Sequence, residues 1–127
     1  MLFVGVDIIE IDRIEDAIAR WGERFLARVY TEAELEVCRG RTPALAVRFA
    51  AKEAVMKALG TGTNGVGWQD IEVLPNPDGK PLVFLHRGAR KKSEELGMTH
   101  LDLSLSHSHH YAVASAVGGR IEDSNPR

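Results

Sequence analysis

The alternation of apolar and polar positions divides the chain into strand-like and helix-like segments. LFVGVDII, over residues 2–9, is a β-branched apolar run that predicts a buried strand. A helical pattern follows from about residue 12 to residue 29. Thr31 and Glu34 then form a capping-box signature, which predicts a short helix over residues 32–38. The next helix begins near Pro43, because proline is tolerated in a first turn, and it continues to about residue 59.

The second half of the chain predicts two hairpins separated by a helix. Residues 60–67 hold four glycines and predict a loop. DIEVL and PLVFL flank the turn PNPDGK, which indicates the first hairpin, and RGARKKSEEL is a polar helix that ends at Gly97. In LDLSLSHSHHYAVASAV apolar and polar residues alternate, which indicates a second hairpin with His107, His109 and His110 in its turn. This order predicts an α+β domain, in which a mostly antiparallel sheet packs against the long central helix.

Length and composition bound the class of protein. The 127 residues suffice for one domain, expected over residues 1–117, and the polar tail over residues 118–127 is expected to fray. The formal charge of −2 argues against a nucleic-acid partner. The single cysteine, Cys38, excludes an intrachain disulfide and fits a reducing cytoplasm, where we expect the protein. No apolar run approaches the roughly 18 residues of a membrane span, so no membrane association is expected.

The central helix carries two charges in an apolar context. In RFAAKEAVMKALG, residues 48–60, apolar or small side chains fall on both sides of the helix, so we expect both sides to be buried. Glu53 and Lys57 lie among them, one turn apart on the same face. They are either an ion pair that satisfies itself or a pair that holds a metal and a phosphate in a cleft.

Asp7 presents the same choice, because a carboxylate inside an apolar strand needs a partner. That partner is either a hydrogen-bond donor, such as an arginine or a helix N-terminus, or a metal ion. Asp7 and Glu53 together offer two carboxylates, which suits Mg²⁺ bound through substrate phosphates. Lys57 would then contact the same phosphate, and cation, metal and phosphate are the recurring parts of phosphoryl transfer.

Two loops also have a structural and a functional interpretation. The glycine-rich loop over residues 60–67 either simply ends the helix or leaves backbone bare for a phosphate. His107, with His109 and His110, is either solvated at a turn or part of a histidine zinc site, although no standard ligand spacing is present.

The first predicted helix carries a stripe of arginines. Their separations of seven, four and four residues place them within about 80° of one another around the helix axis. The stripe is either a solvated face, diluted by nearby acids, or a docking strip for an acidic partner. Its members are Arg13, Arg20, Arg24 and Arg28.

Three stretches of the sequence coincide with one family. GVDIIEIDRI resembles the G-x-D-x-x-x-x-x-R-I opening of the 4′-phosphopantetheinyl transferases of the holo-acyl-carrier-protein synthase type. RFAAKEAVMKALGTG is similar to the central F-A-x-K-E-A-x-x-K-A motif of that family, and LSLSHSHHYAVA resembles its closing L-S-x-(S/T)-H-x-x-x-Y-A-x-A motif. DIEVLPNPDGKP also resembles its hairpin with a G-K-P turn. The motifs occur in the family's order and cover nearly the whole chain.

The resemblance implies an activity and a partner. The family transfers the phosphopantetheine arm of coenzyme A to a serine of an acidic apo acyl carrier protein, with Mg²⁺, and releases adenosine 3′,5′-bisphosphate. It acts as a homotrimer with the active site between neighbouring subunits. Two rivals stay open: another small Mg²⁺ enzyme, such as a phosphohydrolase, and a non-catalytic module that binds an acidic helical protein.

The resemblance also assigns roles to residues. Asp7 and Glu53 would bind Mg²⁺ on the coenzyme A pyrophosphate, and Lys57 would contact the phosphates and protonate the departing one. The positions beside the bound coenzyme would be Gly60, Gly62 and His107, and those that bind the carrier protein would be Arg13, Arg20, Arg24 and Arg28. Arg48 and Lys52 lie beside the motif and are expected either to reach the phosphates or to face solvent.

Overall fold

The computed structural model describes residues 1–122. Its strands are β1 (Leu2–Glu10), β2 (Ile71–Pro75), β3 (Pro81–Leu85), β4 (His100–His107) and β5 (Tyr111–Gly119). Its helices are α1 (Ile11–Trp21), α2 (Glu23–Val29), α3 (Glu32–Cys38), α4 (Thr42–Leu59) and α5 (Arg87–Glu95), with a 3-10 helix η1 (Trp68–Asp70) before β2. None of the helices in this part of the chain combines the length and apolar composition needed to cross a bilayer.

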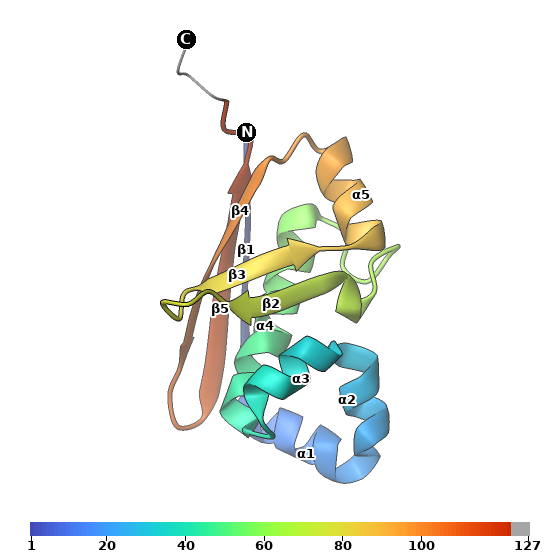
Figure 1. Cartoon of the computed structure of the whole chain (residues 1–127), viewed down its shortest axis with the longest axis vertical. Helices are drawn as coiled ribbons and strands as arrows, with labels where there is room; N and C mark the ends of the chain where they lie inside the picture. The colour runs from blue at the N-terminus through green and yellow to red at the C-terminus, as the bar shows by residue number, and fades with distance from the viewer. Residues whose placement is uncertain (123–127) are drawn as a thin grey trace.

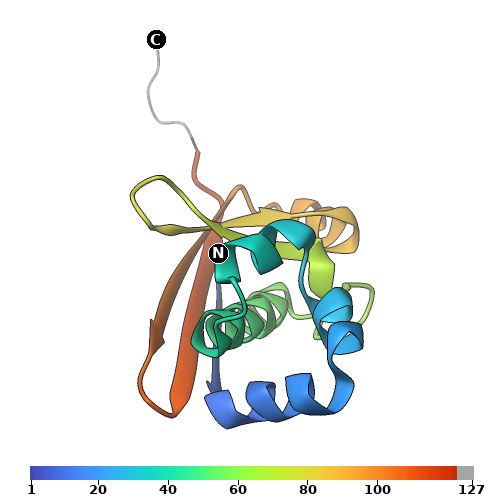
Figure 2. The same cartoon turned by 60° about the horizontal axis from the view of Figure 1, so that its bottom comes forward.

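The strands form two antiparallel sheets, and α4 is the central helix (Figure 1). Strands β1, β5 and β4 make the larger sheet in that order, and β2 and β3 make a separate hairpin. Figure 2 shows α4 between the larger sheet and the group of α1, α2 and α3. The predicted α+β fold around a long central helix is confirmed, with the strands divided between two sheets.

The helical segment predicted over residues 12–29 is two helices, so this prediction was wrong. Gly22 separates α1 from α2 with φ 54° and ψ −131°, a conformation that L side chains rarely adopt. Its N–H closes α1 on the carbonyl of Ile18 at 2.8 Å. The sequence hid the break because a single glycine is tolerated within a helical pattern. The four arginines therefore lie on two helices. The prediction that they lie within about 80° of one another around a single helix axis was wrong.

Other element boundaries follow the sequence signals. Thr31 Oγ1 accepts a hydrogen bond from the N–H of Glu34, whose carboxylate accepts one from the N–H of Thr31, so the capping box is confirmed. Gly60 ends α4 in the left-handed conformation, with φ 76°. β5 continues to Gly119, past the domain boundary expected at residue 117. Within the predicted tail, residues 123–127 lie outside the described part of the chain.

The first strand is buried on one face only. Gly5 and Ile9 are buried on the inward face, and Asp7 lies on the same face. Four of the outward side chains of β1 are apolar and between 57% and 72% exposed; they are Leu2, Val4, Val6 and Ile8. The fifth outward position is the exposed acid Glu10. Period-2 alternation therefore explains the orientation of Asp7, which the continuous apolar run concealed.

α4 approaches the larger sheet closely because small residues line both surfaces. A Cβ at Gly5 of β1 would overlap the carbonyl oxygen of Ala54 on α4, so only glycine permits this approach. This contact brings the strand position of Asp7 alongside the helix position of Glu53. The fully buried alanines of the interface are Ala50, Ala51 and Ala54 on α4 and Ala112, Ala114 and Ala116 on β5.

Arg48 and Lys52 are buried and hydrogen-bonded within the protein, so the expectation that they face solvent was wrong. Lys52 is fully buried, and its Nζ donates to the Glu34 carboxylate at 2.8 Å and to the carbonyls of Trp68 and Ile71. Arg48 Nε donates to a backbone carbonyl of β2 at 3.0 Å. Burial lowers the pKa of Lys52, and the negative charge of Glu34 opposes that shift. These two cations join α4 to α3 and the small sheet.

Candidate active site

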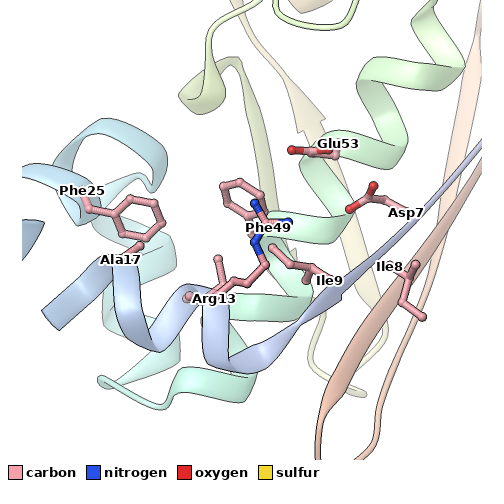
Figure 3. Close-up of a pocket in the computed structure, with 9 residues that line it drawn as sticks. Asp7, Ile8, Ile9, Arg13, Ala17, Phe25, Phe49 and Glu53 are labelled. Carbon is pink, nitrogen blue, oxygen red and sulfur yellow. The ribbon is translucent and has the colours of Figure 1, made fainter. Parts of the chain in front are cut away.

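Asp7 of β1 and Glu53 of α4 meet at a pocket of about 290 Å³. Figure 3 shows the two carboxylates close together, with Arg13 and Phe49 beside them. The structure therefore brings together the two acids that the sequence singled out. The remaining lining is apolar and consists of Ile8, Ile9, Ile14, Ala17 and Phe25.

Lys57 pairs with Asp7 rather than with Glu53. Its Nζ donates to Asp7 Oδ1 at 3.2 Å and to the carbonyl of Val6 at 2.9 Å. The Lys57 side chain is 55% exposed, whereas that of Asp7 is 12% exposed. The self-contained pair of Glu53 and Lys57 is therefore not the arrangement that forms. Instead, the ammonium group of Lys57 lies beside the Asp7 carboxylate, on the solvent-exposed side of the two acids.

Burial and the neighbouring Asp7 carboxylate raise the pKa of Glu53. Burial is the largest cause, and the negative charge of Asp7 is the second. Lys57 and Arg13 oppose the shift, because both carry positive charge. A carboxylate whose ionised form is disfavoured by a neighbouring negative charge is stabilised by a cation bound beside it.

The two acids fit a hard divalent cation whose remaining ligands are water molecules and phosphate oxygens. Within residues 1–122, no three His, Cys, Asp or Glu side chains gather into a group that could hold a metal ion. A pair of carboxylates is nonetheless typical of Mg²⁺ sites, in which water and substrate phosphates complete the shell. The like-charge repulsion at Glu53 supports the same assignment. The residues that would hold Mg²⁺ are therefore Asp7 and Glu53.

The other predicted coenzyme residues lie outside this pocket. Gly60 and Gly62 both have positive φ, and a Cβ at either would meet no atom within 4 Å, so backbone conformation rather than space favours glycine there. His107 is the exposed last residue of β4. In Figure 1, α4 ends toward the chain's N-terminus, whereas the turn between β4 and β5 lies at the opposite end of the sheet. One chain therefore does not bring His107 and the glycine loop together.

The predicted arginine strip divides into two exposed groups, one on α1 and one on α2. Arg13 lines the pocket with Asp7 and Glu53, and Arg13 and Arg20 line a neighbouring hollow. Arg24 and Arg28 line a further hollow on α2 with Trp21 and Phe25. The arginines thus form a surface that begins at the acid pair.

Sequence reasoning missed the aromatic side of the site. Phe49 of α4 stacks on Trp68 at a ring-centroid distance of 4.7 Å, and Phe25 of α2 stacks on Phe49 at 6.3 Å. Trp21 is also missed, although it is 53% exposed beside the arginines. Phe49 lies four residues before Glu53, and this i, i+4 spacing was the signal that could have placed it beside the acid.

Comparisons with known proteins agree along almost the whole chain. The model of the 4′-phosphopantetheinyl transferase superfamily matches residues 3–115. The holo-[acyl-carrier-protein] synthase of Herpetosiphon aurantiacus is 51% identical over 125 residues, which covers 93% of this chain and 98% of that protein. That of Dehalococcoides mccartyi is 53% identical over 117 residues, with 92% and 98% covered.

A solved structure agrees as well. The crystal structure of Helicobacter pylori holo-[acyl-carrier-protein] synthase in complex with coenzyme A has a TM-score of 0.84 and 32% identity, and the match covers 91% of this chain and 99% of that one. Sequence and fold therefore lead to the same assignment. The chain belongs to the 4′-phosphopantetheinyl transferase superfamily and, within it, to the holo-[acyl-carrier-protein] synthase family of enzymes.

Proposed function

We propose that this enzyme transfers the 4′-phosphopantetheine arm of coenzyme A to a serine of apo acyl carrier protein. The products would be holo carrier protein and adenosine 3′,5′-bisphosphate. The observation that carries the proposal is the convergence of Asp7 and Glu53 on one pocket, with Lys57 and Arg13 beside them. The coenzyme A bound in the Helicobacter pylori relative supports the choice of donor.

The chemistry follows from the charges in the pocket. Asp7 and Glu53 would hold Mg²⁺, which when bound would neutralise charge on the coenzyme pyrophosphate. Lys57 would hydrogen-bond a phosphate oxygen and donate a proton to the departing bisphosphate. The serine proton would pass to a carboxylate as the new oxygen–phosphorus bond forms and the bond to the bisphosphate breaks. Asp7 and Glu53 are both candidates to accept it.

The proposal includes a homotrimer with the active site between subunits. The outer face of β1 supports this assembly, because four adjacent outward side chains of an edge strand are apolar and exposed. The separation of His107 from Gly60 and Gly62 supports it too. A single coenzyme site that uses all three positions needs residues of two subunits.

The arginine surface is proposed to bind the acidic carrier protein in the cytoplasm. Arg13, Arg20, Arg24 and Arg28 are all exposed, and they follow α1 and α2 away from the pocket. A local positive surface on a chain of net charge −2 can steer an acidic partner to one face. Trp21 and Phe25 would add apolar contact within it.

Intact-mass measurement on apo carrier protein with coenzyme A and Mg²⁺ tests the proposal. The unmodified enzyme should add one phosphopantetheine mass to the carrier protein. Asp7→Ala and Glu53→Ala should abolish that gain while keeping the circular dichroism of the wild type, and Glu95→Ala, an exposed acid on α5, should leave it unchanged. Near-normal turnover in either pocket variant would contradict the metal assignment. No mass gain with the wild type would favour one of the two rivals.

A further inference from the structure

The glycine-rich loop after α4, residues 60–67, is fastened at its far end to the start of α5. Asp70 of η1 accepts a hydrogen bond from the N–H of Gly67 at 2.9 Å through Oδ2. Its Oδ1 accepts a second from Arg87 Nε at 2.7 Å, and its backbone carbonyl accepts one from the N–H of His86 at 2.7 Å. One nearly buried carboxylate therefore joins the end of the loop to the first turn of α5.

The loop and α5 also touch directly, at two glycines. A Cβ on Gly88 would overlap the carbonyl oxygen of Gly65, at a separation below the 3.0 Å that real Cβ contacts respect. Gly88 is not in a left-handed conformation, so space rather than backbone geometry demands glycine there. The side chain of Asp70 lies on the same spot, 3.5 Å from the position of that Cβ. The contact is close enough to fix the position of Gly65.

Arg87 adds a strained backbone to this junction. Its φ is 45°, which places a non-glycine residue in the left-handed region at the first position of α5. Such a conformation persists only where the surroundings determine it. The ion pair with Asp70 can maintain this conformation, because Asp70 on η1 holds the side chain of Arg87 on α5.

The other end of the loop is fastened to α4. The N–H groups of Gly60 and Thr61 bond carbonyls of the last turn of that helix, at 3.0 and 3.1 Å. Between the two anchors, the residues from Gly62 to Gly65 are exposed. Residues 60–67 thus form a short exposed arch that starts one turn beyond Lys57. Hydrogen bonds fix both of its ends.

We propose that Asp70, Arg87 and Gly88 are positioning residues that hold this arch in the shape that receives the phosphates of coenzyme A. The proposal rests on the proposed function, which places Gly60 and Gly62 at the coenzyme. None of these three residues lines the pocket of Asp7 and Glu53. They act on the coenzyme only through the loop.

The test compares two arginines of one helix. Arg87 pairs with Asp70 beside the loop, whereas Arg90 pairs with Glu94 on its own helix, and the two side chains are 67% and 71% exposed. Arg87→Ala should raise the KM for coenzyme A by about fivefold without changing kcat or the KM for carrier protein, and Arg90→Ala should change none of them. Arg87→Lys should recover part of the loss, because the positive charge remains.

Gly88→Ala should have the larger effect. The loop must move by about 1 Å to admit the methyl group, and we expect the KM for coenzyme A to rise by about tenfold or more. Should this variant fail to fold, Arg87→Ala still decides, because its exposed side chain can be removed without opening the core. An unchanged KM for coenzyme A in Arg87→Ala, or equal losses in both substrates' KM values and kcat, would overturn the proposal.

Amide hydrogen exchange separates this proposal from the proposed function. Residues 61–66 should exchange faster in Arg87→Ala than in Arg90→Ala, with or without coenzyme A. If the wild type fails to modify carrier protein, the proposed function fails, and the positioning of the loop for coenzyme A fails with it. If the wild type is active but loop exchange is equal in the two variants, the anchoring role alone is overturned.

Discussion

Replacing Glu53 by glutamine should stabilise the free protein while removing its activity. Burial and the negative charge of Asp7 both raise the pKa of Glu53, so its ionised form costs folding free energy at neutral pH. Glutamine keeps the size of the side chain and removes the charge. The same change would remove one of the two proposed Mg²⁺ ligands, so phosphopantetheine transfer should be lost. A residue kept for packing alone would not show this opposition of stability and activity.

The magnitude follows from Coulomb's law with screening. Two like charges roughly 4 Å apart repel by about 1 kcal/mol in water and by about 4 kcal/mol at an effective dielectric constant of about 20. Glu53 is only partly buried, and Lys57 and Arg13 supply opposing charge. Solvent screening therefore favours the lower end, a gain of about 0.5–1 kcal/mol.

The sign of the pH dependence provides an internal control. The folded-state pKa of Glu53 lies above its ordinary value of 4.5, so the folded protein binds this proton more tightly than the unfolded chain does. The wild type should therefore lose stability relative to Glu53→Gln as pH rises from 4.5 through the folded pKa. As pH falls below 4.5 the carboxyl group becomes neutral in both states, and the difference should shrink toward zero.

Urea unfolding at fixed protein concentration measures the effect, with the midpoint compared at equal slope. Series at neutral pH and near pH 4, with and without Mg²⁺, give the full comparison, and Glu95→Gln on α5 is the matched exposed control. Mg²⁺ should stabilise the wild type and the control but not Glu53→Gln. The reasoning is refuted if Glu53→Gln is less stable than the wild type at neutral pH, or if it responds equally to Mg²⁺.

Three further predictions concern other parts of the molecule. Lys52→Met should lower the free energy of unfolding in urea by about 3–5 kcal/mol, because it leaves the Glu34 carboxylate buried without its cation. Adding Glu34→Gln should restore much of that free energy, and a loss under about 1 kcal/mol in Lys52→Met contradicts the reasoning. Arg24→Glu should raise the KM for carrier protein and leave the KM for coenzyme A unchanged, and added salt should reduce the effect. An unchanged KM for carrier protein would contradict the proposal that the arginine surface binds it. Val4→Lys, on the exposed face of β1, should convert a trimer to monomers in sedimentation velocity, and an unaltered trimer would exclude that face.

Local signals in the sequence placed most of the elements. The capping box of Thr31 and Glu34, the hairpin turns and the alternation of β4 each depend on interactions within a few residues, so each was readable without a fold. The break at Gly22 was not readable, because glycine takes its positive φ only where the packing of α1 and α2 requires a turn. The roles of Arg48 and Lys52 were missed for a related reason. Their partners on α3 and β2 are distant in the sequence, and a charge pattern alone does not distinguish a buried cation from an exposed one.

The amino-acid order by itself determined which residues are candidates for the chemistry: a carboxylate in an apolar strand, and a second carboxylate and a lysine one turn apart on an apolar helix. It also supplied the motifs that match the family. Only the tertiary structure decided how these groups pair. Gly5 lets α4 approach β1 closely, so Asp7 takes Lys57 as its partner and faces Glu53 across the pocket. It also decided that the outer face of β1 is exposed and that His107 lies far from the glycine loop. The physical reason is that side-chain type is a local property, whereas partnership and burial depend on contacts between residues far apart in the chain.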